Sequence, residues 1–258
     1  MVVLAIPFGF AIGLVVGTVG GGGAILALPL LVYVLGEEVG PASTASLIVV
    51  AMAAGVGAGA LALRGHVCWR VALTFTAPAA AGALLGTVAN TAVSPKVLIL
   101  AFVPVMLVAS AATWRRAAQV HGEDEGACPD VPLDRMLVAG GGVGVLTGFF
   151  GVGGGFLIVP VLTLWLGFGF RRAVATSLVI ITLTGVAALA SHLAIGASVE
   201  LPVTIALALS TGVGALVGSL FAQRVPQAML GRAFAVVVGL LALFLLADTL
   251  LLGGPPGG

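Results

Sequence analysis

The chain has 258 residues, of which 60% are hydrophobic and only 7% are charged, and its formal net charge is +1. Soluble domains carry about 25% charged residues, so this composition excludes a soluble globular protein. Several uncharged apolar runs reach the length of about 20 residues that spans a bilayer as a helix. These runs are continuous rather than alternating, which also argues against a membrane β-barrel. We therefore predict an all-α polytopic membrane protein.

Taken in chain order, the apolar runs form two sets of five, separated by one polar stretch. The predicted pieces are 2–19, 24–36, 40–63, 70–90 and 96–114, and then 135–150, 155–168, 172–195, 200–221 and 226–252. The second piece of each set is too short to span a bilayer as an untilted helix. We expect the first two pieces of each set to form a broken or re-entrant helical hairpin, followed by three transmembrane helices.

This order divides the chain into four parts. Residues 1–114 form a first membrane repeat, 115–134 a polar connector, 135–252 a second membrane repeat, and 253–258 a tail of glycine and proline that we expect to be disordered. Because the chain starts on an apolar stretch without a basic segment, we do not interpret residues 1–10 as a cleaved signal peptide.

Each set of apolar pieces contains a run of glycines between its first and second pieces. The two runs are Gly20–Gly23 and Gly151–Gly155, the second interrupted by Val152. Consecutive glycines disfavour a helix because they lose more backbone entropy than other residues when they become ordered. Backbone that leaves the helical conformation inside a membrane must be covered by protein or line a wet cavity. The runs are thus candidates for a transport site, with close helix packing through small residues as the alternative.

A shift of 131 residues aligns the two halves. It places Gly13 on Gly144 and Pro29 on Pro160, and after one inserted residue it places Gly82 on Gly214. A match of this extent indicates a gene duplication, and its period is far too long for a solenoid.

The basic residues indicate how the repeats are inserted. If each glycine-broken stretch crosses the membrane straight, the ten basic residues divide five against five. If it is a hairpin that returns to its starting side, all of them except Lys96 lie on one face. Because basic residues in short loops mark the cytoplasmic side, we favour the hairpin, with the 115–134 connector in the cytoplasm and both termini outside.

In this arrangement the repeats have opposite orientations, and equivalent loops carry opposite charges. Glu37 and Glu38 align with Arg171 and Arg172, for example. Inverted repeats with broken helices in matching positions are typical of secondary transporters that alternate access to a site at the bilayer midplane.

The chemistry predicted for that site is anion binding. Backbone N–H groups freed at a helix N-terminus attract negative charge, and hydroxyl groups can donate hydrogen bonds without introducing a buried charge. The candidate substrate-binding residues are Gly20, Gly21, Gly22, Gly23, Thr44, Ser46, Gly151, Gly153, Gly154, Gly155, Thr176 and Ser177. The alternative for the hydroxyls is that they bond back to carbonyl groups of their own helices.

Three further residues are candidates for coupling or gating. His192 is titratable and lies inside an apolar run, which makes it a functional candidate, although it could instead face a polar interior or the outer interface. Pro29 and Pro160 follow the glycine runs and are expected to shape the short helices after them. Cys68 and Cys128 have neither metal-site nor disulfide-framework spacing, so we expect two unpaired thiols.

Other functions have little support in the sequence. It holds no nucleophile elbow, HExxH or Walker motif, so we expect neither an enzyme nor a metal or cofactor. A non-transporting scaffold remains an alternative. No carboxylate falls clearly in the middle of an apolar run, so a proton relay is not indicated. An inside-negative potential favours anion efflux by about 2.3 kcal/mol per charge per 100 mV, which favours export over import.

The ordered motifs resemble those of the sulfite exporter TauE/SafE family of membrane transporters. The resemblance rests on the two glycine runs followed by Pro29 and Pro160, on Ala-Thr-Ser-Leu at 175–178, on the segment from Gly65 to Arg70, and on Gly82 to Gly86. It implies a permease of the inner or plasma membrane that moves sulfite, a sulfonate or a related sulfur-containing anion. In the first repeat Ala45 stands where the second has Thr176, so the site is expected to be asymmetric.

Together these observations predict an exporter of a small anion that works by alternating access between the two glycine-rich breaks. The alternative within the same class is an importer of a sulfur compound or another small ion. The expected partners are the anionic substrate and the lipid bilayer, without nucleic acid, and a homodimer is kept as an option.

Overall fold

The protein is a helical bundle in its computed structural model, which describes residues 2–21, 31, 39–90, 93, 95–119, 128–150, 155–194 and 201–252. Its helices are α1 (Val2–Val19), α3 (Val39–Ala62), α4 (Trp69–Asn90), α5 (Pro95–Gln119), α6 (Leu133–Phe150), α7 (Gly155–Pro160), α8 (Phe170–Ala194), α9 (Leu201–Ala222) and α10 (Gln227–Ala247), with π-helical turns at η3 (Val161–Trp165) and η4 (Asp248–Leu252). Six of them, α3, α4, α6, α8, α9 and α10, are long and apolar enough to cross a bilayer. The predicted all-α membrane class is confirmed for the described residues.

The predicted pieces agree closely with these helices, with one difference and one gap. Helix α5 continues to Gln119, five residues beyond the predicted end at 114. Arg115 and Arg116 can continue the helix because long basic side chains bury their stems and keep their charges in water, and a positive charge near a helix C-terminus is favourable. The predicted piece at 24–36 lies outside the described residues apart from Leu31.

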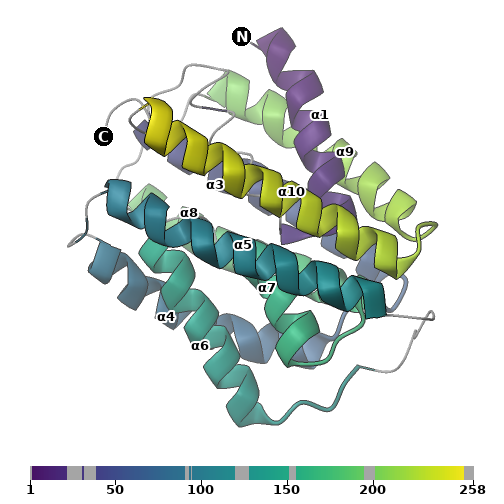
Figure 1. Ribbon diagram of the computed structural model, residues 1–258. Coiled ribbons are helices and arrows are strands. Elements are labelled where there is room, and N and C mark those ends of the chain that lie inside the picture. The colour runs from purple at the N-terminus through teal and green to yellow at the C-terminus, as the bar shows by residue number, and fades with distance from the viewer. Residues whose placement is uncertain are drawn as a thin grey trace.

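Two helix pairs are held at very short range by glycines. A Cβ atom added at Gly13 of α1 would lie 2.1 Å from the carbonyl oxygen of Thr211 in α9, and one added at Gly144 of α6 would lie 2.1 Å from that of Ala79 in α4. The α1–α9 and α4–α6 pairs are visible at opposite sides of the bundle (Figure 1). Glycines let helix backbones approach closely where lipid removes any hydrophobic force between helices.

The close contacts in the two pairs match residue by residue under the sequence shift. The reciprocal glycine of α9, Gly214, would place a Cβ 2.2 Å from the carbonyl oxygen of Phe10, and its counterpart Gly82 of α4 would place one 2.4 Å from that of Gly141. Each pair therefore joins a helix from the first half of the chain to one from the second half through equivalent residues.

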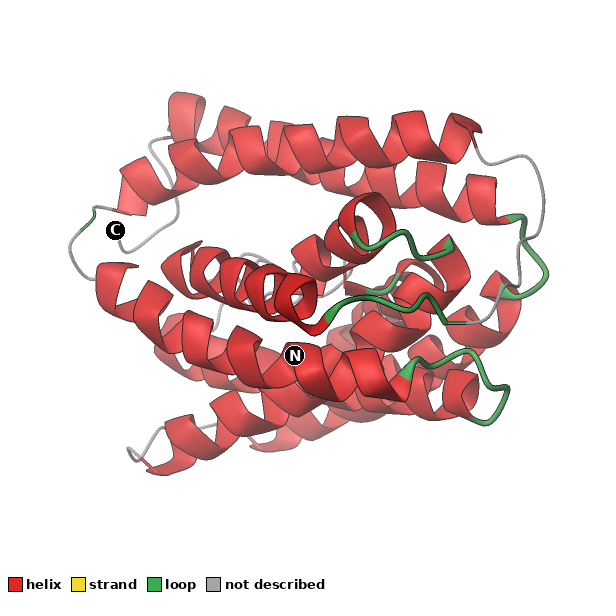
Figure 2. Ribbon diagram, turned by 90° about the horizontal axis from the view of Figure 1, so that it is seen from below, coloured by secondary structure: helices red, strands yellow, loops and turns green. Residues whose placement is uncertain are grey.

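Helices α3 and α8 pack against each other, and α5 packs against α10. Helices α5 and α10 run side by side along their length, as both views show (Figures 1 and 2), and the Ser110 hydroxyl donates a hydrogen bond to the carbonyl oxygen of Ala235 over 2.7 Å. In the other pair, Gly185 lies opposite Ala51 and Gly57 lies opposite Leu178. As the residue number rises along α8 it falls along α3, so α3 and α8 are antiparallel.

Loops from both halves of the chain meet at one end of the bundle. The Arg64 side chain donates a hydrogen bond to Gln223, and the Arg232 guanidinium lies 5.9 Å from the ring centroid of Trp114. A straight crossing of each glycine-broken stretch would have placed the residues of each of these pairs on opposite faces of the membrane. Among the described residues, both pairs instead lie together at one end of the bundle. We call this end of the bundle the arginine end, defined by Arg64, Arg70, Arg171, Arg172, Arg224 and Arg232.

Candidate functional site

The structure covers part of the predicted substrate site. Of the candidate residues, Gly22, Gly23, Pro29, Gly151, Gly153 and Gly154 lie outside the described residues. His192 belongs to helix α8, but its side chain lies outside the described part of the chain. The described candidates are Gly20, Gly21, Thr44, Ser46, Gly155, Pro160, Thr176 and Ser177.

The ends of the two glycine-broken stretches touch each other. A Cβ added at Gly21 would lie 1.7 Å from the carbonyl oxygen of Gly155, and one added at Gly155 would lie 3.0 Å from the Cα of Gly21. Neither position therefore has room for a side chain, and no solute fits between these two residues in this structure. The contact lies halfway along α8, because Ile181, the twelfth of its 25 residues, has its Cδ1 2.9 Å from a Cβ added at Gly155.

Gly20 joins this contact to a hydroxyl of α8. Its φ angle of +77° lies in the left-handed region that favours glycine, and this conformation ends α1 after Val19. A Cβ added at Gly20 would lie 3.1 Å from Oγ of Ser177. The structure thus brings together Gly20, Gly21, Gly155 and Ser177 at the middle of the bundle.

The two predicted site hydroxyls of α8, those of Thr176 and Ser177, are fully buried and make different hydrogen bonds. Ser177 donates a hydrogen bond to the carbonyl oxygen of Val174 in its own helix over 2.8 Å. This is the bond that we gave as the alternative to substrate binding. Thr176 accepts a hydrogen bond from the backbone N–H of Cys68 over 3.2 Å. Thr176 therefore holds the segment that leads into α4 against α8.

The hydroxyls of α3 lie far from those of α8. Thr44 is buried and Ser46 is partly buried, and both lie near the start of α3. In the antiparallel α3–α8 pair, Thr176 lies level with Ala60 of α3. At about 1.5 Å per residue, that level is about 24 Å along the axis from Thr44. The two hydroxyl sets are therefore not neighbours in this structure, although the sequence predicted a single central site.

Pro160 marks a change in the helix that follows the second glycine run. Helix α7 ends at Pro160, and η3 continues from it with a backbone hydrogen bond from Leu166 to the carbonyl oxygen of Val161 over 3.1 Å. Proline lacks the N–H that would continue the α-helical pattern. The Thr163 hydroxyl also donates to the carbonyl oxygen of Val159 over 2.9 Å. The change from α7 to η3 thus falls at Pro160.

A disulfide joins two segments at the arginine end. Cys68 and Cys128 are bonded, and the bond links residues 60 positions apart in the sequence. The expectation of two unpaired thiols is wrong, because both residues precede helices, α4 and α6, that pack tightly together through glycines. Cys68 is buried and Cys128 is exposed.

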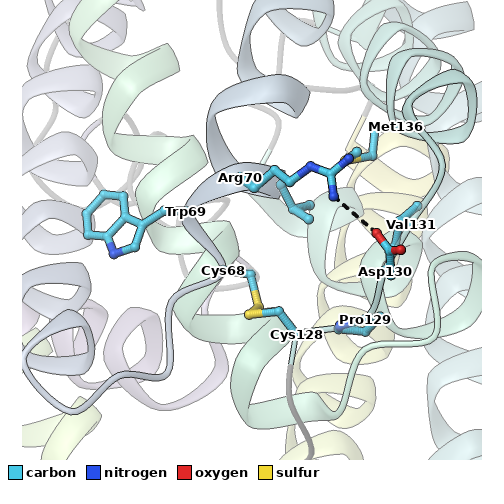
Figure 3. A pocket seen from close by; sticks show the side chains of 9 residues that line it. Cys68, Trp69, Arg70, Cys128, Pro129, Asp130, Val131 and Met136 are labelled. Atoms are coloured by element: carbon cyan, nitrogen blue, oxygen red, sulfur yellow. Dashed lines mark hydrogen bonds and ion pairs between the residues drawn. A yellow bond between two sulfur atoms is a disulfide. The ribbon is translucent and has the colours of Figure 1, made fainter.

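A cavity of about 160 Å³ lies beside the disulfide (Figure 3). Its lining consists of Cys68, Trp69, Arg70, Val71, Cys128, Pro129, Asp130, Val131 and Met136. Arg70 and Asp130 form an ion pair over 3.1 Å, and both side chains are largely exposed, so the pair contributes at most about 1 kcal/mol to stability. This cavity holds none of the predicted site residues.

Comparison with known proteins identifies the class of this helical bundle. The family described as "Sulfite exporter TauE/SafE" matches residues 5–245. The chain belongs to the TauE/SafE family. Two proteins of Xylella fastidiosa described as probable membrane transporter proteins are similar to this chain. The one of strain 9a5c is 30% identical to it and the one of strain Temecula1 is 32% identical, and each match covers 95% of this chain and 94% of the relative. A probable membrane transporter protein of Methanocaldococcus jannaschii is 24% identical over 94% of both chains. No solved structure matches the chain.

Membership of the TauE/SafE family makes this chain a multi-pass membrane transporter rather than an enzyme, which confirms both expectations. Among the described residues, no group of three or more His, Cys, Asp or Glu side chains could hold a metal ion.

The sequence of this TauE/SafE chain did not point to the Cys68–Cys128 bond or to the interactions around Gln223. A separation of 60 residues carries no recognised cysteine pattern, and Gln223 could only be placed at the end of a helix. The segment from Gly65 to Arg70, which carried part of the family resemblance, contains Cys68 and directly follows Arg64, the residue that donates to Gln223. That motif was the feature of the sequence that could have drawn attention to this region.

Proposed function

We propose that this TauE/SafE transporter exports a small anion, with an oxidised sulfur species such as sulfite or a sulfonate as the substrate class. The family description names sulfite export. A buried path without a fixed positive charge suits such an anion, because hydroxyl and backbone N–H groups can donate hydrogen bonds to its oxygen atoms as it passes.

The single observation that carries the proposal is the contact of Gly21 with Gly155 halfway along α8, beside Ser177. Gly21, which follows the end of α1, and Gly155, the first residue of α7, come from opposite halves of the chain and meet inside the helical bundle. An interruption of a helix inside a membrane is tolerated where protein covers it or where it lines a cavity. We infer that the contact is the closed state of the permeation path and that its separation admits the anion.

We propose that the two halves of the chain are inverted repeats that work by alternating access. The matched glycine contacts of the α1–α9 and α4–α6 pairs are those expected when equivalent helices exchange partners between repeats. In such a transporter, one repeat rocks against the other around a fixed site. We propose that Thr176 and Ser177 serve the side of the path nearer the arginine end, and that Thr44 and Ser46 serve the opposite side. Gly22, Gly23, Gly151, Gly153 and Gly154 remain proposed members of the same path, with His192 proposed for coupling or gating.

We propose that the arginine end faces the cytoplasm and that both termini lie outside. Two general rules conflict here, because disulfides are typical of oxidising compartments, whereas basic loops mark the cytoplasmic side. The charge rule carries more weight, because it rests on nine basic residues and the disulfide is one bond. In either orientation of the protein, an inside-negative membrane potential favours anion export.

Proteoliposomes of the purified protein test this proposal. Vesicles loaded with sulfite, or with a sulfonate in a parallel set, receive an inside-negative potential from a potassium gradient and an ionophore. The proposal predicts efflux that grows with the potential and needs neither a sodium nor a proton gradient. Flux that requires one of those gradients would contradict potential-driven export, and the absence of flux for every sulfur oxyanion would contradict the substrate class.

A further inference from the structure

The arginine end brings three separate segments of the chain together around one turn. The Arg172 Nη1 donates to the carbonyl oxygen of Gly65 over 3.2 Å, and the neighbouring Arg64 donates to Oε1 of Gln223. The Arg171 Nη2 donates to the carbonyl oxygens of Gln223 and Val225 over 3.1 and 3.3 Å. Arg64, Arg171, Arg172 and Gln223 therefore form one cluster around the Arg64–Gly65 turn, which we call the turn cluster.

Two donors of the turn cluster are buried without an acceptor. Within the described part of the chain, Nε of Arg172 and Nε2 of Gln223 are buried and have no hydrogen-bond partner. A buried donor that lacks an acceptor costs about 1–3 kcal/mol, and more if it is charged. A ligand that carries several acceptor oxygens would remove this cost.

The position of the arginines on α8 adds an independent reason to expect negative charge. Arg171 and Arg172 lie in the first turn of this 25-residue helix, which contains no acidic residue. The N-terminus of a helix carries partial positive charge, so anions are stabilising there and cations are unfavourable. Arg171 is also only 8% exposed, which reduces screening of its charge by water. The N-terminal end of α8 therefore carries concentrated positive charge, which favours the approach of an anion.

The disulfide holds this arrangement in place. The Arg172 Nη1 lies 3.7 Å from Sγ of Cys128, and Cys68, bonded to Cys128, follows the Arg64–Gly65 turn by three residues. Two covalently linked segments thus flank the Arg172 side chain. A fixed guanidinium loses less entropy when it binds an oxyanion than a freely rotating one does.

We propose that the turn cluster is a binding site for an oxyanion of sulfur or phosphorus, separate from the Gly21–Gly155 contact. Arg172 donates through Nε, Gln223 donates through its side-chain amide, and Arg64 and Arg171 supply further positive charge. Guanidinium groups match the geometry of oxyanions and form charge-assisted hydrogen bonds with them. If the ligand is the transported anion, the site collects it at the arginine end before transport. The identity of the ligand as the transported anion rests on the proposed function, whereas the existence of the site does not rest on it.

The same chemistry is shared by a free anion and by the headgroup of an anionic lipid. We commit to the free anion, because the two unpartnered donors are buried rather than directed along the bundle surface. The lipid headgroup is distinguished by one arm of the experiment.

The test is a binding titration of the full-length protein in nanodiscs of zwitterionic lipid, with sulfite and phosphate as probes and chloride at matched ionic strength as the reference. The variants are Arg172→Gln, Arg64→Gln and the control Arg115→Gln, which removes an exposed arginine of α5 outside the turn cluster. We expect about a tenfold loss of oxyanion affinity for each of the first two variants and no change for the control. Arg64 is exposed, so its variant gives a result even if Arg172→Gln fails to fold.

Equal affinity of the wild-type, Arg172→Gln and Arg64→Gln proteins for sulfite and phosphate would overturn the site, as would binding no tighter than that of chloride. Repetition in nanodiscs of anionic lipid distinguishes the sources: loss of sulfite binding by the wild type assigns the site to a lipid headgroup, and retention assigns it to the free anion. The titration requires no transport. Variant-sensitive binding in a protein without flux would therefore support this site while contradicting the proposed function.

Discussion

The backbone N–H of Cys68 donates a hydrogen bond to the hydroxyl of Thr176 over 3.2 Å, in the buried interior of the bundle. Thr176 is one of the hydroxyls predicted for the substrate path, and Cys68 is one half of the disulfide. A hydrogen bond therefore connects the disulfide near the arginine end to Thr176, a residue of the proposed path.

Loss of the disulfide should destabilise the protein. A Cys128→Ser variant frees a loop of 60 residues, and disulfides typically stabilise a protein by about 2–4 kcal/mol, with longer loops at the upper end. We expect the melting temperature in detergent to fall for this variant and for the wild type after reduction. Reduction of the variant should cause no further change. An unchanged melting temperature in both reduced wild type and variant would show that the bond does not constrain the fold.

Replacement of Thr176 should cost more stability than replacement of Ser177. Thr176→Val removes the acceptor of the Cys68 N–H and leaves a buried donor unpaired, at about 1–3 kcal/mol. Ser177→Ala removes only a hydroxyl bonded to its own helix, so the loss in unfolding free energy should be well below that of Thr176→Val. Under the proposed function, Ser177→Ala nevertheless raises the KM for anion flux. Melting curves and flux, measured on the same preparations, separate the two effects; a Ser177→Ala protein with unchanged KM would remove Ser177 from the path.

The glycines between α6 and α4 should tolerate no side chain. Gly144→Leu places a Cβ 2.1 Å from the carbonyl oxygen of Ala79, so the helices must separate, and overpacking of this kind costs about 1–3 kcal/mol or more. The control is Gly142→Leu on the same helix, where a Cβ would meet no atom within 4 Å. We expect the first variant to melt earlier or to aggregate during gel filtration, while the control behaves as the wild type does. Similar behaviour of the two variants would be evidence against close packing of this helix pair.

Orientation in the membrane can be measured by labelling. In a protein with both native cysteines changed to serine, Arg115→Cys introduces a thiol at an exposed position next to Trp114, which contacts Arg232 of the arginine end. We expect a membrane-impermeant maleimide to label it in inverted vesicles and not in intact cells. The opposite pattern would place the arginine end outside, where the disulfide rule alone would put it.

Much of the fold could be predicted from the sequence because lipid imposes a simple rule. Spans must be helical and apolar, so the limits of helices such as α4 and α9 follow from hydropathy alone. The glycines of α1 and α6 were recognised as a repeated pattern, with helix packing kept as the alternative to a site. The structure separates two groups of glycines by what they contact. Gly13 of α1 and Gly144 of α6 pack against neighbouring helices, whereas Gly20, Gly21 and Gly155 lie where the two glycine-rich stretches meet.

The arrangement of the site was less predictable. The shift of 131 residues pairs Ser46 with Ser177, but sequence equivalence does not give distance, and antiparallel packing of α3 and α8 puts their hydroxyls at different levels of the bundle. The Cys68–Cys128 bond and the hydrogen bond from Arg64 to Gln223 depend on which loops meet in space. Such meetings leave no periodic pattern in a single sequence.

The most direct test of the account is sulfite flux through proteoliposomes that contain Gly21→Ala, Gly155→Ala or the control Gly142→Ala. A methyl group at Gly21 would lie 1.7 Å from the carbonyl oxygen of Gly155, whereas one at Gly142 meets no atom within 4 Å. If the meeting of the two glycine segments forms the closed path, flux at equal protein density should change severalfold in the first two variants and stay at the wild-type level in the control. Wild-type flux in both Gly21→Ala and Gly155→Ala would contradict the account.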